Sequence, residues 1–401
     1  MAPAPLPIHE SLYASLLAWA NEPIAITSKV SIKPYELRTE LFVFVGAIAF
    51  WIIHLVGKST NRRLAHNWVR EALPMIEKEF ATTANDGQGK GELLLWNGGD
   101  EAVLYASGRR SVESMHAHFS LTPRQDPLLY LYHFISDIAL ATPLSSARDT
   151  LTLTFQLPTP PAAATSDVFG VFSIVDKRCL QSLRQARPFD LSFARLLESN
   201  DERERRSLSQ QWAVMSENAE LTDSYLGEVG QKGDARRAKV GIQTVLNSAA
   251  GEWLESLILT DVPQHRPESV AAATAAATAQ HPRLLIVNLR VPRGAASIRN
   301  SLPLLLCACN ILDAIDLNVI PPLTDRARTK MRSARQAVDA AVLKELQEEE
   351  GGGEDEKAKG KQSKAKNRGE MSEKEQQKRK ELEEKRARRK AQGKMKVGGR
   401  A

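Results

Sequence analysis

One apolar segment near the N-terminus places the strongest constraint on how this chain folds. Leu41–Val56 (LFVFVGAIAFWIIHLV) is sixteen residues long and contains no Asp, Glu, Lys or Arg. As a helix it would be about 24 Å long, and with its flanking residues about 27 Å, which matches a thin bilayer. Trp51 and His54 lie toward one end, where amphipathic side chains suit a membrane interface. We therefore expect one transmembrane helix at 41–57 rather than a helix buried in a soluble core.

The charges around this segment favour a cytosolic C-terminal side. Basic residues flank it on both sides: Lys29, Lys33 and Arg38 before it, and Lys58, Arg62, Arg63 and Arg70 after it. The excess after it is small, so the positive-inside rule gives only a slight preference. Three cysteines without a disulfide framework fit a reducing compartment, and no Asn-x-Ser/Thr acceptor occurs. We predict that residues 1–40 are lumenal, with a short amphipathic helix at Ser11–Trp19, and that residues 58–401 are cytosolic.

Residues 58–345 mix strand and helix patterns, which predicts one α/β (α+β) domain. The strands are expected at Leu93–Trp96, Ala102–Ser107, Met115–Leu121, Leu151–Leu157, Val168–Val175, Leu254–Thr260 and Arg283–Val291. Asn97-Gly98-Gly99 is a hairpin signal between the first two of these strands. The last, RLLIVNLRV, is the strongest strand pattern in the chain.

Helical spacing of apolar residues predicts the remaining elements of the domain. Helices are expected at Asn61–Thr82, Leu128–Ile135, Asp176–Arg187, Ala213–Tyr225, Arg236–Ala250, Ser297–Ile315 and Arg326–Leu346. Pro74 lies inside the first of these and predicts a kink or a break there. Ala271–Ala279 (AAATAAATA) is of low complexity and lies among Pro and His residues, so we expect an inserted surface loop.

Local motifs for chemistry are weak, so we expect no enzyme activity, no cofactor and no metal site. No nucleophile elbow, phosphate-binding Gly loop or HExxH helix occurs. His116 and His118 would face the same side of a strand as half a metal site, but a polar strand face is the favoured interpretation. Cys307 and Cys309 are expected to be buried structural thiols. Ser107–Arg110 favours a turn over an anion site.

The end of the chain is basic and carries almost no apolar residues. From Gly351 onward there are 18 Lys and Arg against 9 Asp and Glu, although the whole chain has a net charge of only +6. We expect residues 346–401 to form an acidic, Gly-containing hinge (Glu345–Lys361) followed by a charged helix. The segment Lys385–Lys396 of this tail contains no acid and seven basic residues: Lys385, Arg386, Arg388, Arg389, Lys390, Lys394 and Lys396. They suit a phosphate backbone, as in ribosomal RNA, or anionic lipid; a solubilising tail is the plainer alternative.

Small residues within the apolar segment suggest a contact with another membrane helix. Gly46, Ala47 and Ala49 would allow a second helix to approach closely. We expect a small membrane partner to bind this face, or else the apolar face of the adjacent helix.

Several short motifs, taken in order, resemble one known family. They are Gly57-Lys-Ser-Thr-Asn61-Arg-Arg-Leu-Ala-His-Asn-Trp68, Leu104-Tyr-Ala-Ser-Gly-Arg109, Arg124-Gln-Asp126, Ser301-Leu-Pro-Leu-Leu-Leu306, Asn310-Ile-Leu-Asp313 and the charged tail ending at Lys394-Met-Lys396. Together they resemble the calumin family of coiled-coil-domain membrane proteins of the endoplasmic reticulum (ER), which includes the larger subunit of the PAT complex. The resemblance covers most of residues 40–401, and its weight comes from the order of the motifs and their membrane and tail context.

This resemblance implies a single-pass ER membrane protein with a cytosolic domain that faces the ribosome. It implies work beside the Sec translocon with a small membrane partner of the Asterix type, shielding incompletely folded segments of nascent multipass membrane proteins. Animal members carry a long acidic lumenal region linked to calcium binding. Here the residues before the segment include only four acids, Glu10, Glu22, Glu36 and Glu40, so we do not expect calcium binding.

Two rival interpretations differ from this expectation in class. The first is a membrane-tethered adaptor that binds the ribosome or RNA without a chaperone role. The second is an enzyme whose site is assembled from residues that are dispersed in the sequence. A deep polar pocket with converging titratable groups would support the second rival.

Overall fold

The computed structural model describes residues 14–15, 17–19, 21–27, 30–33, 35, 38–83, 92–140, 148–158, 169–197, 208–226, 240–278, 281–317, 319–320 and 323–351. Within the chain, two compact units separate. The first comprises Met1–Arg266 with Gln280–Arg332, and the second comprises Pro267–Ala279 with Ser333–Ala401. Apart from α9, the residues just before it and α11 from Ser333 onward, every feature described below belongs to the first unit.

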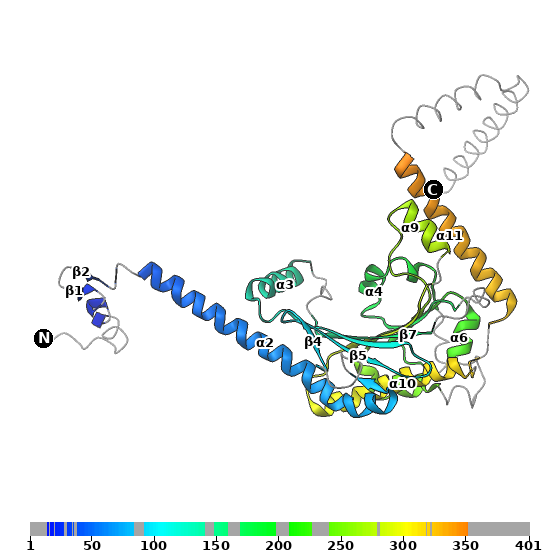
Figure 1. Cartoon of the computed structure of the whole chain (residues 1–401), viewed down its shortest axis with the longest axis horizontal. Helices are drawn as coiled ribbons and strands as arrows, with labels where there is room; N and C mark the ends of the chain where they lie inside the picture. The colour runs from blue at the N-terminus through cyan, green and yellow to red at the C-terminus, as the bar shows by residue number, and fades with distance from the viewer. Residues whose placement is uncertain are drawn as a thin grey trace, which may run out of the picture. The chain divides into compact units, whose positions relative to one another are not determined.

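The first unit is built around one ten-stranded sheet in which every strand pair is antiparallel (Figure 1). Its strands are β3 Thr82–Thr83, β4 Leu95–Asn97, β5 Glu101–Ser107, β6 Ser114–Ser120, β7 Thr150–Leu157, β8 Phe172–Asp176, β9 Arg195–Leu196, β10 Trp212–Ser216, β11 Leu254–Thr260 and β12 Arg283–Arg290. Their order is β3-β5-β6-β7-β12-β11-β8-β10-β9, with β4 also on β5. The fold is therefore mixed α+β. A separate hairpin joins β1 (Ile24–Thr27) to β2 (Val30–Ile32).

Helices cover both faces of this sheet. On one face lie α10 (Ala295–Asp316) and the inner part of α2 (Arg38–Glu79) (Figure 1). The core on this face also includes residues of α6 (Ala219–Leu226), α8 (Ile242–Leu246) and the 3-10 turn η5 (Ala249–Trp253). The opposite face carries a smaller apolar cluster with α4 (Leu180–Ala186) and the 3-10 turn η4 (Asp190–Ser192). Because both faces are covered, all five residues of β8 are buried. The apolar cluster on the first face includes no residue of the helix α3 (Pro127–Leu140).

Most predicted elements are present, and three expectations are wrong. The segment 213–225 is not one helix: Trp212–Ser216 pairs with β8 as β10, and only α6 follows it. The segment 236–250 is described from Val240 onward, and there Gly241 interrupts the expected helix with φ +69°, so that only the short α8 and η5 follow. The surface loop expected at 271–279 is instead α9 (Val270–Thr278), because alanine is the strongest helix former and Ser269 Oγ accepts from the Ala272 amide at 3.2 Å.

Two helices also run further than the sequence suggests. The helix α2 continues through Pro74 to Glu79 without a break, because Ala72 and Ile76 are held in the core on either side. The helix α11 (Asp325–Gly351) extends into the first residues of the expected hinge. The rest of that hinge and the tail lie outside the described residues.

Candidate membrane-anchor junction

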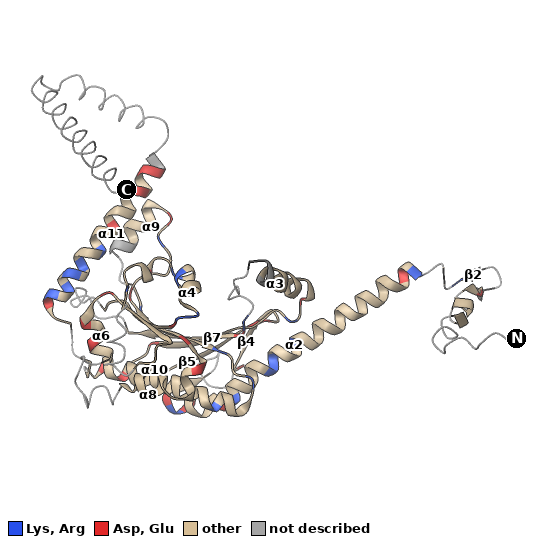
Figure 2. Cartoon of the chain, turned by 180° about the vertical axis from the view of Figure 1, so that it is seen from behind, with Lys and Arg blue, Asp and Glu red and all other residues tan. Residues whose placement is uncertain are grey.

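The first half of α2 is an apolar helix with no protein packed around it. Every residue from Arg38 to Val56 is exposed except the half-buried His54, and Phe42 has 77% of its surface exposed. Figure 2 shows this part as a long uncharged stretch that begins with charged residues at its outer end. Among the described helices, α2 and α10 are long and apolar enough to cross a membrane, but α10 is largely buried against the sheet and α2. The exposed half of α2 is therefore the candidate span.

The expected partner residues lie in this exposed half but do not form one face. Gly46, Ala47 and Ala49 are all exposed, and no atom lies near the Cβ position of Gly46. On a helix with about 100° per residue, Gly46 and Ala49 share a face. Ala47 and Ala49 diverge by about 160°, so a single partner helix cannot pack against both.

The second half of α2 changes environment abruptly at Gly57. Its buried residues recur at helical spacing: Gly57, Asn61, Ala65, Trp68, Val69, Ala72 and Ile76. The indole of Trp68 packs edge-on against Phe119 of β6, with ring centroids 5.6 Å apart. This face is part of the core of the domain, so it is not open to the membrane partner that the sequence analysis allowed there.

Gly57 is the residue at which the domain first packs closely against α2. A Cβ atom at Gly57 would lie 2.2 Å from the backbone oxygen of Arg124, so only glycine permits this close approach. One turn further, the Asn61 amide donates to the carbonyl oxygens of Gly99 (2.9 Å) and Thr122 (3.0 Å). Its oxygen accepts from Arg124 Nη1 at 2.7 Å. The loop 122–126 is thereby fixed against the helix.

We call these contacts of Gly57 and Asn61 with the loop 122–126 the junction. Asp149 completes the junction from the opposite side of the loop. Arg124 donates to both of its carboxylate oxygens, at 2.9 and 2.7 Å, and Arg293 Nη2 donates at 3.0 Å. The backbone amide and hydroxyl of Thr122 donate to Oδ1 as well. Burial alone would raise the pKa of Asp149, but the hydrogen bonds and charge of Arg124 and the hydrogen bonds from Thr122 outweigh it and lower the pKa to about 2. The carboxylate is therefore charged at neutral pH.

A second charged cluster fixes the far end of α2. Arg109, with only 11% of its side chain exposed, pairs with Glu79 of α2 and donates to Asp313 Oδ2 of α10 at 2.7 Å. Gly108 precedes it with φ +87°, in a turn that brings its backbone against Ala81. Because two carboxylates already engage Arg109, the Ser107–Arg110 segment is a structural turn, as favoured above, and not an anion site.

The contacts around Arg124 and those around Arg109 bring together the motifs that carried the family resemblance. Gly57 and Asn61 meet Arg124 in the junction, while Arg109 meets Asp313 in the second cluster. Asp149 could not be identified from the sequence, because nothing in its neighbourhood marks it as the partner of two arginines. No local motif identifies it; only the fold brings it to Arg124.

The remaining candidates of the sequence analysis have ordinary structural positions. His116 lies edge-on to Tyr105 on an exposed strand face, 5.2 Å between ring centroids, with His118 on the same face. Cys307 and Cys309 are buried, as expected, and burial is the main reason that their pKa values rise to about 12 and about 11. Among the described residues no group of three or more His, Cys, Asp or Glu is placed to hold a metal. The seven basic tail residues lie outside the described part of the chain.

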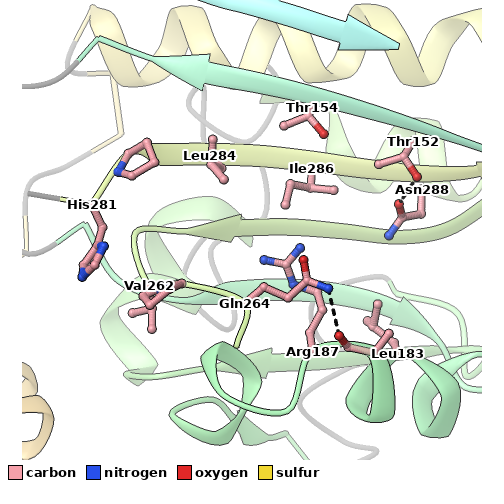
Figure 3. A pocket seen from close by; sticks show the side chains of 13 residues that line it. Thr152, Thr154, Leu183, Arg187, Val262, Gln264, His281, Leu284, Ile286 and Asn288 are labelled. Atoms are coloured by element: carbon pink, nitrogen blue, oxygen red, sulfur yellow. Dashed lines mark hydrogen bonds between the residues drawn. The ribbon is translucent and has the colours of Figure 1, made fainter. Parts of the chain in front are cut away.

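A cavity of about 520 Å³ lies on the sheet face that carries α4 (Figure 3). Its walls come from three regions: Thr152, Thr154, Leu284, Ile286 and Asn288 on β7 and β12, Leu183, Ala186 and Arg187 around the end of α4, and Val262, Pro263, Gln264, His281 and Pro282 in loops. Two of its polar groups bind within the wall: Thr152 donates to Asn288 at 2.8 Å, and Gln264 donates to the Ala186 carbonyl oxygen at 2.9 Å. Arg187 is held by Asp190 at 2.7 Å. The lining residues include no carboxylate and no paired nucleophile and base, so the cavity gives the enzyme alternative no support.

Comparison with known proteins identifies related chains. A family model described as PAT complex subunit CCDC47 matches residues 36–390. The UPF0674 endoplasmic reticulum membrane protein of Schizosaccharomyces pombe is 26% identical over 234 residues, which are 58% of this chain and 56% of the relative. PAT complex subunit CCDC47 of Danio rerio is 31% identical over 96 residues (22% and 19%), and that of Xenopus laevis is 27% identical over 117 residues (27% and 24%). The alignments thus cover about half or less of each relative.

Proposed function

The chain belongs to the CCDC47 family of PAT complex subunits, and from this membership we propose that it serves the biogenesis of multipass membrane proteins in the ER. The family is not an enzyme family. In the proposed role the protein is a subunit of an intramembrane chaperone complex at the ribosome and Sec translocon, together with a small membrane partner of the Asterix type. Its clients are nascent multipass proteins.

The observation that carries this proposal is the exposed apolar half of α2, joined without a break to a folded domain. A semi-polar client helix in lipid holds unsatisfied polar groups until its own partners arrive. A protein that covers such a helix needs a surface inside the membrane and a fixed attachment outside it. The contacts of Gly57, Asn61 and Arg124 supply the attachment, because they tie the helix to the sheet at the end of the apolar stretch.

The proposed topology places residues 1–40 in the lumen and residues 58–401 in the cytosol. Protease treatment of sealed microsomes tests this orientation directly. A tag at the C-terminus should be digested without detergent, whereas a protected tag would reverse the orientation and remove the ribosome-facing role.

Affinity purification of the full chain in mild detergent tests the assembly. We expect ribosomal subunits, translocon subunits and one small hydrophobic protein to be recovered together. A chain in which polar residues replace 41–56 is the matched control, because it keeps the domain and the tail but loses the span. Recovery of none of these partners with the unaltered chain would contradict the proposal.

A second candidate function rests on the basic tail. The seven Lys and Arg residues from Lys385 to Lys396 favour a membrane-tethered adaptor that binds ribosomal RNA without acting on clients. This alternative predicts recovery of ribosomes with the chain but without the small membrane partner.

A further inference from the structure

The helix α3 (Pro127–Leu140) exposes apolar side chains where a soluble protein would expose polar ones. Leu128 has 72% of its surface exposed, Leu131 52%, Phe134 57% and Ile135 55%. His133 and Ser136, which are polar, are less exposed. Isolated exposed apolar residues are common, but a cluster of them on two successive helical turns indicates an interaction site.

Most of the exposed apolar residues of α3 lie on one side of the helix axis, although Leu129, which is 40% exposed, lies on the other. At about 100° per residue, Leu128, Leu131, Phe134 and Ile135 fall within one broad face. His133 and Ser136 lie on the other side. Tyr130 and Tyr132 border the apolar face, one on each edge, where an aromatic ring with a hydroxyl suits the boundary between lipid and water. This arrangement is typical of a helix that lies in a membrane interface.

The start of α3 is fixed at the level where the candidate span ends. The loop that leads into α3 runs past Gly57, where an added Cβ atom would lie 2.2 Å from the backbone oxygen of Arg124 and 2.6 Å from the backbone nitrogen of Gln125. His54 lies near the end of the apolar stretch, and its Nδ1 atom is 3.1 Å from the backbone oxygen of Gln125. Asp126 then caps the helix, because its Oδ1 accepts from the amides of Leu128 and Leu129 at 3.0 Å. The helices α2 and α3 are in contact.

We propose that α3 is an interfacial helix whose outward apolar face is buried in the lipid of the leaflet next to the domain. The proposal rests on the proposed membrane span, since the span sets the level of the bilayer at Val56 and Gly57. Lipid is the favoured occupant because α3 begins beside the end of the exposed half of α2 and exposes apolar side chains of its own. The helix thereby holds the domain close against the membrane surface.

Fluorescent probes at introduced cysteines test this placement in the full-length protein. Cys179, Cys307 and Cys309 are buried, so a thiol-reactive probe should label an introduced surface cysteine selectively. The variants are Leu131→Cys and Phe134→Cys on α3, Ile48→Cys in the span, and Gln210→Cys at an exposed polar position as the matched control. Each labelled protein is placed in phosphatidylcholine vesicles whose acyl chains carry bromine, a quencher, either near the headgroup or near the chain end.

We expect the probes at Leu131 and Phe134 to be quenched mainly by the shallow bromine, since an interfacial helix is immersed by about 5–10 Å. The probe at Ile48 should be quenched mainly by the deep bromine, and the probe at Gln210 by neither. If only the Ile48 probe is quenched, α3 does not lie in lipid and its placement is wrong, while the span remains supported. This holds whatever else covers the apolar face of α3. If the Ile48 probe is also unquenched, the span and the interfacial helix both fail.

Discussion

At the scale of single residues, Asp149 makes the junction sensitive to acid. Its pKa is lowered from 3.8 to about 2 in the folded protein, so its contribution to stability is present above about pH 4 and is lost as the pH falls toward 2. The shift corresponds to about 2 kcal/mol. Asp149→Asn should therefore lower the free energy of unfolding by at least this amount at about pH 7, since it leaves Arg124 and Arg293 without their buried counter-charge.

Urea unfolding of the full chain in detergent, followed by tryptophan fluorescence, measures this effect. The stability of the unaltered protein should fall between about pH 4 and pH 2 as Asp149 is protonated, and the stability of the variant should fall much less over the same range. Asp316→Asn is the control, because its partner Arg110 is 86% exposed and such pairs contribute about 0–1 kcal/mol. Equal stability of the two variants would mean that Asp149 does not hold the junction.

Gly57 gives a second prediction at this scale. Gly57→Ala would place a methyl group 2.2 Å from the Arg124 oxygen, so the loop 122–126 must move, at a cost of roughly 1–3 kcal/mol. Gly46→Ala on the same helix meets no atom within 4 Å and should be neutral or slightly stabilising, by up to about 1 kcal/mol. Thermal unfolding in detergent compares the two. A Gly57→Ala protein as stable as Gly46→Ala would exclude the close approach that we describe.

Residue roles were only partly predictable from the sequence. The burial of Cys307 and Cys309 follows from their apolar helix, and the turn at Gly108 follows from local turn chemistry. The partners of Arg109 and Arg124 could not be predicted, because Asp313 and Asp149 are brought to them by long-range contacts. Sequence spacing also suggested Ala47 and Ala49 together, although a helix separates their side chains.

At the scale of elements, α2 is one helix in two environments. Its first half is apolar on all sides, whereas its second half is buried along one stripe, and the change falls at Gly57. Sequence patterns predicted both halves as separate helices, whereas the structure joins them in one helix. Pro74 predicted a kink or a break within the second half, and the helix continues through it. Strands with strict alternation, such as β6 and β7, were predicted closely. The segment 213–225 was not, because helical spacing of its apolar residues competes with the pairing of β10.

The partner face of the span gives a prediction for this element. Ala47→Leu and Ala49→Leu each add bulk on a different side of α2, so we expect one of them to reduce recovery of the small membrane partner clearly more than the other. Both variants should stay in the membrane. Quantitative co-purification from mild detergent measures the difference. Full recovery with both variants would move the contact away from these small residues.

At the scale of the whole molecule, the tail is the proposed link to the ribosome. Removing Met371–Ala401 should reduce co-sedimentation with ribosomes at moderate salt, because the deletion removes the basic side chains that would contact phosphate groups. Each lost phosphate contact should also lower the slope of log affinity against log salt by about 0.7–0.9. Membrane association should persist, since the span secures it. If ribosome recovery does not change, the tail is not the docking element and the folded domain must bind the ribosome.

In the proposed role this protein acts on nascent membrane segments and does not merely bring ribosomes to the membrane. Photo-crosslinking distinguishes these two roles, with a crosslinking amino acid at Ile48 or Ile52 of α2 and ribosomes stalled on a multipass client at successive lengths. We predict crosslinks from α2 or its co-purified small partner to client helices that carry polar residues. These crosslinks should disappear when the client is complete. Ribosomes that co-purify with the protein, without a client crosslink at any length, would contradict the chaperone role and favour the adaptor.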